Sequence, residues 1–323
     1  MTRLAAVDCG TNSIRLLIVD ADEQGRQREI QRTMEIVRLG KGVDATGELD
    51  PAAIDRTRAA LARYVQVMKF EQVKDVRMVA TSATRDASNR NDFFNMTAEL
   101  LGEVRPGAVA EVISGEEEAS LSFRGAVADL PADRGPFCVI DLGGGSTEFI
   151  VGEHDGAIYG SHSAQMGCVR ISERIMRSDP PTANEIEIAE DYVAERLERV
   201  KLLVPIDKAR TFVGCAGTFT TLSALAQGLE EYDPRATHCS ELRLDALQVL
   251  TKQLRGFPSA QLAQNKVIHP GRADVISGGT MVVDGIAKMI PQVTGVNSIV
   301  ISEKDILDGI IAGLVETSPA MMQ

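Results

Sequence analysis

A short motif that occurs twice constrains this chain more than any other feature. Asp8-Cys-Gly-Thr-Asn-Ser13 returns 133 residues later as Asp141-Leu-Gly-Gly-Gly-Ser146, so that both copies read Asp-x-Gly-x-x-Ser. Each copy follows four apolar residues and precedes a run typical of a β-strand, which predicts a β-hairpin with the motif as its turn. Two copies at this separation indicate a duplicated domain, because a solenoid would need more repeats.

The residue types in these two turns suit phosphate. Glycine permits positive φ and lets a ligand come close to the backbone, successive amides form an anion-binding concavity, and the serine hydroxyl adds a donor. Asp8 and Asp141 would repel phosphate, so we expect them to hold Mg²⁺ or Mn²⁺, directly or through water. Glycine, aspartate and serine are also the residues of ordinary tight turns, but the repetition of the motif favours phosphate binding.

The charge of the chain limits its partners. The 323 residues carry a net charge of −12, which makes nucleic acid a poor ligand. A polyanionic substrate can then bind only where backbone amides, a few arginines and a divalent cation form the site. The length suggests about two domains, and 44% hydrophobic with 25% charged residues is the balance of a globular protein.

The cysteine and histidine patterns argue against two other classes. Five cysteines are odd in number and form no Cys-x-x-Cys pair, and the four histidines show no metal-ligand spacing, so neither disulfides nor a zinc site are expected. No apolar run is long enough to cross a bilayer, and the N-terminus lacks the pattern of a signal peptide. We therefore expect a soluble, cytoplasmic protein with neither a membrane nor a nucleic-acid partner.

The rest of the chain alternates strand and helix patterns. Asp50 before Pro51 predicts the start of a helix that reaches about residue 70, and Thr182 with Glu185 forms a capping box for a helix over 182–203. Turn-forming residues at 130–136 predict the domain boundary. The other expected strands are 27–38, 76–80, 109–113, 211–213 and 299–301, and the other expected helices are 90–101, 114–127, most of 244–290 and 303–315.

Motifs along almost the whole chain resemble those of the exopolyphosphatase/guanosine pentaphosphate phosphatase (Ppx/GppA) family. The two turns resemble its phosphate loops, and further segments resemble its other motifs, at 39–49, 80–85, 113–119, 214–218 and 272–279. The resemblance implies an α/β fold of the ASKHA superfamily, with two actin-like (ribonuclease H-like) lobes and an interdomain cleft. It implies domain I at 1–130, with a closing helix near 303–316 packed back on it, and domain II at 131–302.

The resemblance also implies roles for individual residues. Glu118 matches the catalytic glutamate and Glu117 is the alternative, although glutamates at a helix start also simply complement the helix dipole. Glu148 is a second catalytic candidate that could orient water or help hold the metal; as an exposed strand residue it could also be inert. Arg85 and Arg272 suit a phosphate, with a surface salt bridge and a solvated helix start as the respective alternatives.

The predicted phosphate-binding set gathers the two turns, the third glycine turn and the two arginines. Its members are Gly10, Thr11, Asn12, Ser13, Arg85, Gly143, Gly144, Gly145, Ser146, Gly214, Gly217, Thr218 and Arg272. The third turn could instead be an ordinary connection between a strand and a helix, without a role in binding. Cys9 and Cys215 lie beside these turns, but we assign the thiols no role because a buried structural cysteine is commoner.

The resemblance leaves several functions open. It implies an exopolyphosphatase that releases orthophosphate from polyphosphate by metal-assisted attack of water. Short chains are the expected substrate, because the sequence ends where the longest members add helical domains. The first alternative is a guanosine pentaphosphate (pppGpp) 5′-phosphohydrolase, and a kinase of the same superfamily and a non-catalytic nucleotide sensor are the others. A homodimer is expected.

Overall fold

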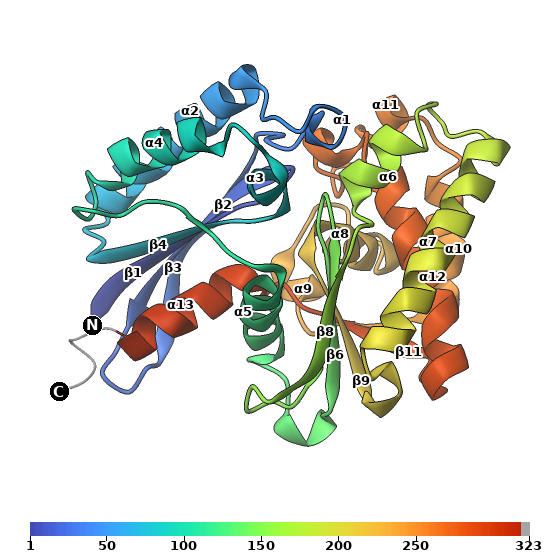
Figure 1. The fold of residues 1–323 in the computed structure, drawn as a ribbon. Coiled ribbons are helices and arrows are strands. Elements are labelled where there is room, and N and C mark those ends of the chain that lie inside the picture. The colour runs from blue at the N-terminus through green and yellow to red at the C-terminus, as the bar shows by residue number, and fades with distance from the viewer. Residues whose placement is uncertain (318–323) are drawn as a thin grey trace. The chain divides into compact units, whose positions relative to one another are not determined.

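Residues 1–317, which the computed structural model describes, form two compact units. Unit 1 comprises Met1–Leu121 together with the chain from Ile306 onward, and unit 2 comprises Ser122–Asp305. The boundary lies inside a single helix, α5 (Gly115–Val127). Each unit contains one β-sheet with helices packed against it (Figure 1).

The sheet of unit 1 is built outward from the first hairpin. β1 (Thr2–Cys9) pairs antiparallel with β2 (Ser13–Ala21), which pairs antiparallel with β3 (Gln27–Ile36). On its other side β1 runs parallel to β4 (Asp75–Ala80), and β4 runs parallel to β5 (Glu111–Val112). The helices of this unit are α1 (Val43–Thr46), α2 (Pro51–Phe70), α3 (Ser82–Asp86), α4 (Arg90–Leu101), the first part of α5, and α13 (Ile306–Thr317).

Both faces of this sheet are covered, which explains why β1 is apolar without alternation. Ala5 and Val7 lie in a core shared with α2 and α4, whereas Leu4 and Ala6 pack with residues of α13. Figure 1 shows α13 on the face of the sheet opposite to α2 and α4. The closing helix of the sequence therefore belongs to the core of the N-terminal unit.

The sheet of unit 2 is built in the same way from the second hairpin. β6 (Phe137–Leu142) pairs antiparallel with β7 (Thr147–Gly152), which pairs antiparallel with β8 (Ile158–Ala164). On its other side β6 runs parallel to β9 (Thr211–Cys215), β9 runs parallel to β11 (Ser298–Ile301), and β10 (Glu241–Arg243) pairs antiparallel with β11.

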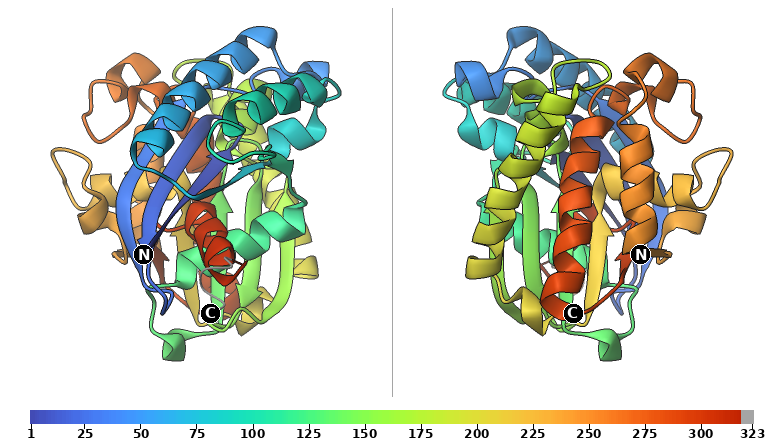
Figure 2. Two further views of the ribbon diagram at one scale, coloured as in Figure 1. Left: turned by 90° about the vertical axis from the view of Figure 1, so that its left-hand side faces the viewer. Right: turned by 90° about the vertical axis from the view of Figure 1, so that its right-hand side faces the viewer.

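The helices of unit 2 include a layer in which α12 (Ile276–Thr294) packs against both α7 (Ala183–Leu203) and α10 (Leu244–Leu254), as the right-hand view of Figure 2 shows. The shorter helices are α6 (Cys168–Arg174), α8 (Ala216–Ala226), α9 (Pro234–Thr237) and α11 (Ser259–Leu262), with short 3₁₀ turns at Ala132–Arg134, Ile206–Lys208 and Pro270–Arg272.

The two sheets share one strand order. It runs β3-β2-β1-β4-β5 in unit 1 and β8-β7-β6-β9-β11 in unit 2, where β10 is added beyond β11. The shared order includes the direction of every pairing, antiparallel on the hairpin side and parallel on the other. The predicted α/β class and the predicted duplication are therefore confirmed.

The helix starts follow their capping signals. Asp50 accepts a hydrogen bond from the Ala52 amide, and α2 begins at Pro51 and ends at Phe70 as predicted. Thr182 and Glu185 form the predicted capping box of α7. The closing helix begins at Ile306 rather than at 303. Arg272 lies in a 3₁₀ turn before α12 instead of opening that helix. Within residues 1–317, no helix combines the length and the apolar character that crossing a bilayer would require.

Candidate functional site

The second turn, residues 143–146, is held from one side by the segment that follows β8. The Gly143 amide donates to the Ser146 carbonyl at 3.0 Å and closes the turn. The Gly143 carbonyl accepts from the Cys168 amide at 3.0 Å, and the Gly144 carbonyl accepts from the amides of Val169 and Arg170 at 2.9 and 3.1 Å. These donors lie at the start of α6.

A third carbonyl of this turn is held by a side chain. The Gly145 carbonyl accepts from Arg170 Nε at 2.7 Å. In a trans peptide the carbonyl of one residue and the amide N–H of the next point in opposite directions. Because the carbonyls of residues 143–145 point to α6, the amides of Gly144, Gly145 and Ser146 point away from it. Outside the helices and strands of residues 1–317 these amides have no backbone acceptor, which makes the turn a candidate anion-binding concavity.

The first turn, residues 10–13, has the same construction. The Gly10 amide donates to the Ser13 carbonyl at 3.0 Å. The Thr11 carbonyl accepts from the Gly40 amide at 2.8 Å, and the Asn12 carbonyl accepts from the amides of residues 37 and 38 at 3.0 and 2.8 Å. The Asn12 amide therefore points away from the chain segment after β3. In both units, therefore, the carbonyls of the hairpin turn accept hydrogen bonds from the segment after the third strand, which is β3 in unit 1 and β8 in unit 2.

The aspartates of the two turns meet opposite charges in the first copy and like charges in the second. Asp8 is paired across the hairpin with Arg15, whose Nη2 lies 2.7 Å from Asp8 Oδ2. At the corresponding place in unit 2, Asp141 is paired across the hairpin with Glu148. Directly paired residues share a sheet face and lie close together, where like charges are unfavourable. Arg15 therefore neutralises Asp8, whereas the hairpin register places the Asp141 and Glu148 carboxylates next to each other on one face of the sheet.

Neutral hydroxyl groups support both carboxylates of this pair. Asp141 Oδ2 accepts from Ser122 Oγ at 2.6 Å, and Glu148 Oε1 accepts from Ser163 Oγ at 2.7 Å. Both acidic residues are buried. Among residues 1–317, no three acidic, histidine or cysteine side chains converge as metal ligands. The donor set fits Mg²⁺, which commonly binds one or two carboxylates and completes its shell with water and substrate phosphates.

The two candidate glutamates at the start of α5 have different surroundings. The Glu118 side chain is 10% exposed, and its Oε2 lies 3.1 Å from Arg85 Nη1. The Glu117 side chain is 45% exposed and pairs with Arg77 at 2.6 Å. Arg85 also donates to the Ile113 carbonyl at 3.0 Å. Glu118 and Arg85 thus form one partly buried group, whereas Glu117 belongs to a surface ion pair.

In unit 1 the helix that carries Arg85 touches the first turn. Arg85 lies on α3, directly after β4, and β4 runs parallel to β1. Thr11 Oγ1 and Ser82 Oγ lie 3.0 Å apart, so the first residue of α3 touches the turn. The carboxyl ends of adjacent parallel strands meet at one edge of a sheet, which is where α/β proteins bind ligands.

Unit 2 places the third glycine turn beside Asp141. Cys215 at the end of β9 is paired in parallel register with Asp141, and α8 begins at the next residue. The Arg272 guanidinium lies so close to Gly217 that a Cβ there would come within 2.2 Å of its Cζ. Glycine at 217 thus leaves room for the Arg272 guanidinium in its present position at the N-terminus of α8. Ala216 has φ of 66°, a strained conformation of the kind that concentrates at functional sites.

Burial keeps two thiols near these turns, those of Cys9 and Cys168, in the protonated form. Burial raises the pKa of the Cys9 thiol well above its usual range. Burial also raises the pKa of Cys168 to about 11, although the nearby Arg272 lowers it. Both side chains are therefore neutral near pH 7 and act as small apolar groups.

Sequence reasoning missed two arginines of this region. Arg15 would have been found from the hairpin register, because it lies as far after the turn as Asp8 lies before it. Arg170 gives no such signal, since it is separated from Gly145 by 25 residues and by the whole of β7 and β8.

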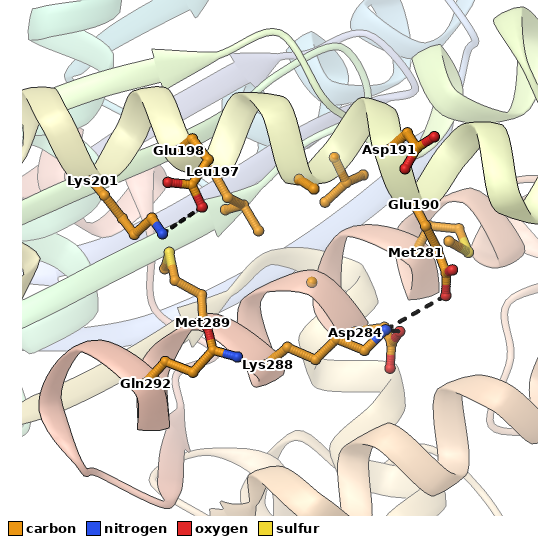
Figure 3. Close-up of a pocket in the computed structure, with 13 residues that line it drawn as sticks. Glu190, Asp191, Leu197, Glu198, Lys201, Met281, Asp284, Lys288, Met289 and Gln292 are labelled. Carbon is orange, nitrogen blue, oxygen red and sulfur yellow. Dashed lines mark ion pairs between the residues drawn. The ribbon is translucent and has the colours of Figure 1, made fainter.

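A pocket elsewhere in unit 2 does not belong to this region. It has a volume of about 220 Å³ and lies between α7 and α12 (Figure 3). Lys288 Nζ is 2.8 Å from Asp284 and 3.5 Å from Glu190, and Lys201 pairs with Glu198. The described lining includes none of the predicted site residues, and its cations are neutralised, so it offers little to a polyphosphate.

Comparison with known proteins agrees with the motifs and the strand order. The model of the Ppx/GppA phosphatase family matches residues 17–317. The chain belongs to this family. It is 51% identical over 317 residues to exopolyphosphatase 2 of Mycobacterium tuberculosis, which covers 97% of this chain and 99% of that protein. Guanosine-5′-triphosphate,3′-diphosphate pyrophosphatase of Aeromonas hydrophila is 29% identical, over 96% of this chain and 59% of that protein.

A similar protein of known structure shares the fold of this chain. The crystal structure of an exopolyphosphatase-like protein superimposes with a TM-score of 0.90 at 36% identity and covers 97% of both chains. The actin-like fold that the motifs implied is therefore confirmed. The roles of individual residues are predictions, which the geometry above makes specific.

Proposed function

We propose that this Ppx/GppA family member is an exopolyphosphatase. It hydrolyses the terminal phosphoanhydride of inorganic polyphosphate and releases orthophosphate by metal-assisted attack of water. The observation that carries the proposal is the second turn, where the outward amides of residues 144–146 adjoin the opposed carboxylates of Asp141 and Glu148. Such a place suits a phosphate group and a divalent cation together.

The cation we propose is Mg²⁺ or Mn²⁺, with Asp141 as the main ligand and Glu148 assisting. When bound, the ion would neutralise charge on the transferred phosphoryl group. Asp8 is the weaker ligand candidate, because Arg15 already neutralises it. The Ser122 and Ser163 hydroxyls keep the Asp141 and Glu148 carboxylates in place.

We propose Glu118 as the residue that accepts the proton of the attacking water, and Arg85 as a phosphate-binding residue. The burial of Glu118 favours it over Glu117, because a base shielded from bulk water keeps a defined position. Arg85 can exchange its present partner for a phosphate, whose geometry its planar fork fits. Arg272 and the N-terminus of α8 are a further proposed phosphate contact.

A phosphate-release assay tests the proposal. Purified protein with Mg²⁺ is offered polyphosphates of graded length, without any acceptor. We expect orthophosphate release, and its loss on addition of a chelator. Turnover that occurs only with an alcohol acceptor and transfers the phosphoryl group to it would indicate a kinase, and tight binding without turnover would indicate a sensor; either result would overturn the proposal.

The second candidate function is hydrolysis of the 5′-γ-phosphate of pppGpp. It is favoured by the similarity to the Aeromonas hydrophila enzyme named above and uses the same chemistry on another phosphoanhydride. Comparison of kcat/KM for tripolyphosphate and pppGpp in the same assay separates the two. We expect the higher value for polyphosphate, in line with the higher identity to exopolyphosphatase 2.

Location in the cytoplasm and assembly into a homodimer complete the proposal. Support for a reducing compartment comes from the five cysteines, all of which are free thiols and four of which are buried. Sedimentation of the purified protein over a range of concentrations would test the dimer. A single monomeric species at micromolar concentration would contradict it.

A further inference from the structure

We propose that Arg170 is a positioning residue for the second turn, and that its side chain sets the direction of the Ser146 amide. The inference rests on the proposed function only in taking the turn's ligand to be a phosphate chain. Arg170 Nε donates to the Gly145 carbonyl at 2.7 Å. Because that carbonyl and the Ser146 amide belong to one peptide plane, the bond turns the Ser146 N–H toward the opposite side.

This third peptide differs from its neighbours in how it is held. The Gly143 and Gly144 carbonyls accept from backbone amides of residues 168–170, which any side chain at those positions would leave in place. The Gly145 carbonyl depends on a side chain. Glycine at 144 and 145 gives these peptides unusual freedom to rotate. A substitution at residue 170 therefore changes one peptide and leaves the other two.

The backbone just before Arg170 packs closely against the second turn. At Gly167 a Cβ would lie 2.3 Å from the carbonyl carbon and oxygen of Gly144, so only glycine allows the chain to pass this close. Thr147 Oγ1 donates to the Met166 carbonyl. The segment 166–170 thus contacts the turn and the first residue of β7, and Arg170 makes the last contact of the series.

Loss of the Arg170 bond should weaken phosphate binding more than it weakens the fold. Without the Nε–H, the Gly145–Ser146 peptide can rotate and direct its carbonyl toward the anion. One amide donor to a charged ligand is worth about a tenfold change in affinity or more. We expect Arg170→Met to raise KM for tripolyphosphate about tenfold or more, with the same direction of change in its Kd.

The matched control is Arg177→Met. Arg177 Nε donates to the Glu173 carbonyl at 2.9 Å, a bond of the same kind, but the residue is exposed and lies beyond α6. Arg170→Lys is the second probe, because lysine keeps the charge but places a methylene where arginine has its Nε–H. For each protein, kcat and KM for tripolyphosphate, the Kd by calorimetry for a slowly hydrolysed tripolyphosphate analogue in the presence of Mg²⁺, and Tm are measured.

The expected result is a rise in KM and Kd for Arg170→Met and Arg170→Lys, with Tm close to that of the Arg177→Met control. Unchanged KM and Kd in Arg170→Met would overturn the inference, as would full recovery in Arg170→Lys, which would indicate a general effect of charge. A fall in Tm with unchanged KM would show a structural role only.

The Kd separates this inference from the proposed function. If the wild-type protein binds tripolyphosphate without hydrolysing it, and Arg170→Met loses that binding, the proposed function fails and the positioning role stands. If the wild type hydrolyses tripolyphosphate and Arg170→Met matches it in KM and Kd, the positioning role fails alone. A wild type that neither binds nor hydrolyses tripolyphosphate contradicts both.

Discussion

Replacement of Glu118 by glutamine isolates the proposed base. Glutamine keeps the size of the side chain and an oxygen that can accept from Arg85 Nη1, now 3.1 Å from Glu118 Oε2, but it cannot take a proton from water. A positioned general base contributes about a hundredfold to ten-thousandfold to a rate. We expect kcat to fall by a factor in this range, with KM changed much less.

Glu117→Gln is the matched control from the same helical turn. Its ion pair with Arg77 involves a side chain that is 45% exposed, so its loss should cost less than about 1 kcal/mol of unfolding free energy. The Glu118 side chain is 10% exposed, and weakening its charge-assisted bond should cost about 1 to 3 kcal/mol. Activity should remain near that of the wild type in Glu117→Gln.

Steady-state kinetics of phosphate release and thermal unfolding of both variants provide the assay. The reasoning predicts a separation in kcat that is far larger than any difference in stability. If Glu117→Gln is the variant that loses kcat, the assignment of the base to Glu118 is wrong by one residue. If neither variant loses more than a fewfold in kcat, a carboxylate at the start of α5 is not the base.

Three further predictions concern the metal, pH and chain length. Asp141→Asn should abolish most turnover while the protein stays folded, and should remove the rise in Tm that Mg²⁺ gives the wild type; retained turnover with ordinary metal dependence would exclude Asp141 from the site. Hydrogen bonds from Arg3 and Arg28 lower the pKa of Asp20 to about 2, so Asp20→Asn should destabilise at neutral pH, and the difference in unfolding free energy should shrink as pH falls from about 4 toward 2. A net charge of −12 and local phosphate contacts predict distributive cleavage, in which a gel of a partial digest shows the whole population shortening; full-length chains beside free phosphate without intermediates would refute it.

The sequence predicts the fold well where local signals are strong. The duplicated turn predicts two hairpins, and the caps at Asp50 and Thr182 predict the starts of α2 and α7. β8 was not predicted, because its residues from Ile158 to Ser163 are exposed or only partly buried and lack apolar alternation. β10 was missed because it spans three residues and is held by pairing with β11.

The residues of the candidate site likewise fall into those that local sequence motifs predict and those that depend on strand register or tertiary packing. The turns, Glu118 and Arg85 come from motifs that are contiguous in sequence. The pairing of Asp141 with Glu148 depends on hairpin register, which fixes that these two residues face each other. The Arg170 contact and the positive φ of Ala216 depend on tertiary packing between distant segments, and no local pattern carries that information.

The origin of the oxygen in the released phosphate tests the central claim most directly. Tripolyphosphate is hydrolysed in H₂¹⁸O with Mg²⁺, and the products are separated and examined by mass spectrometry and ³¹P NMR. Attack of water on the terminal phosphorus predicts one ¹⁸O in each released orthophosphate and none in the shortened chain. Label in the pyrophosphate product, with unlabelled orthophosphate, would show attack of water at the central phosphorus, and the absence of label from both products would show that water is not the nucleophile; either result would contradict the account.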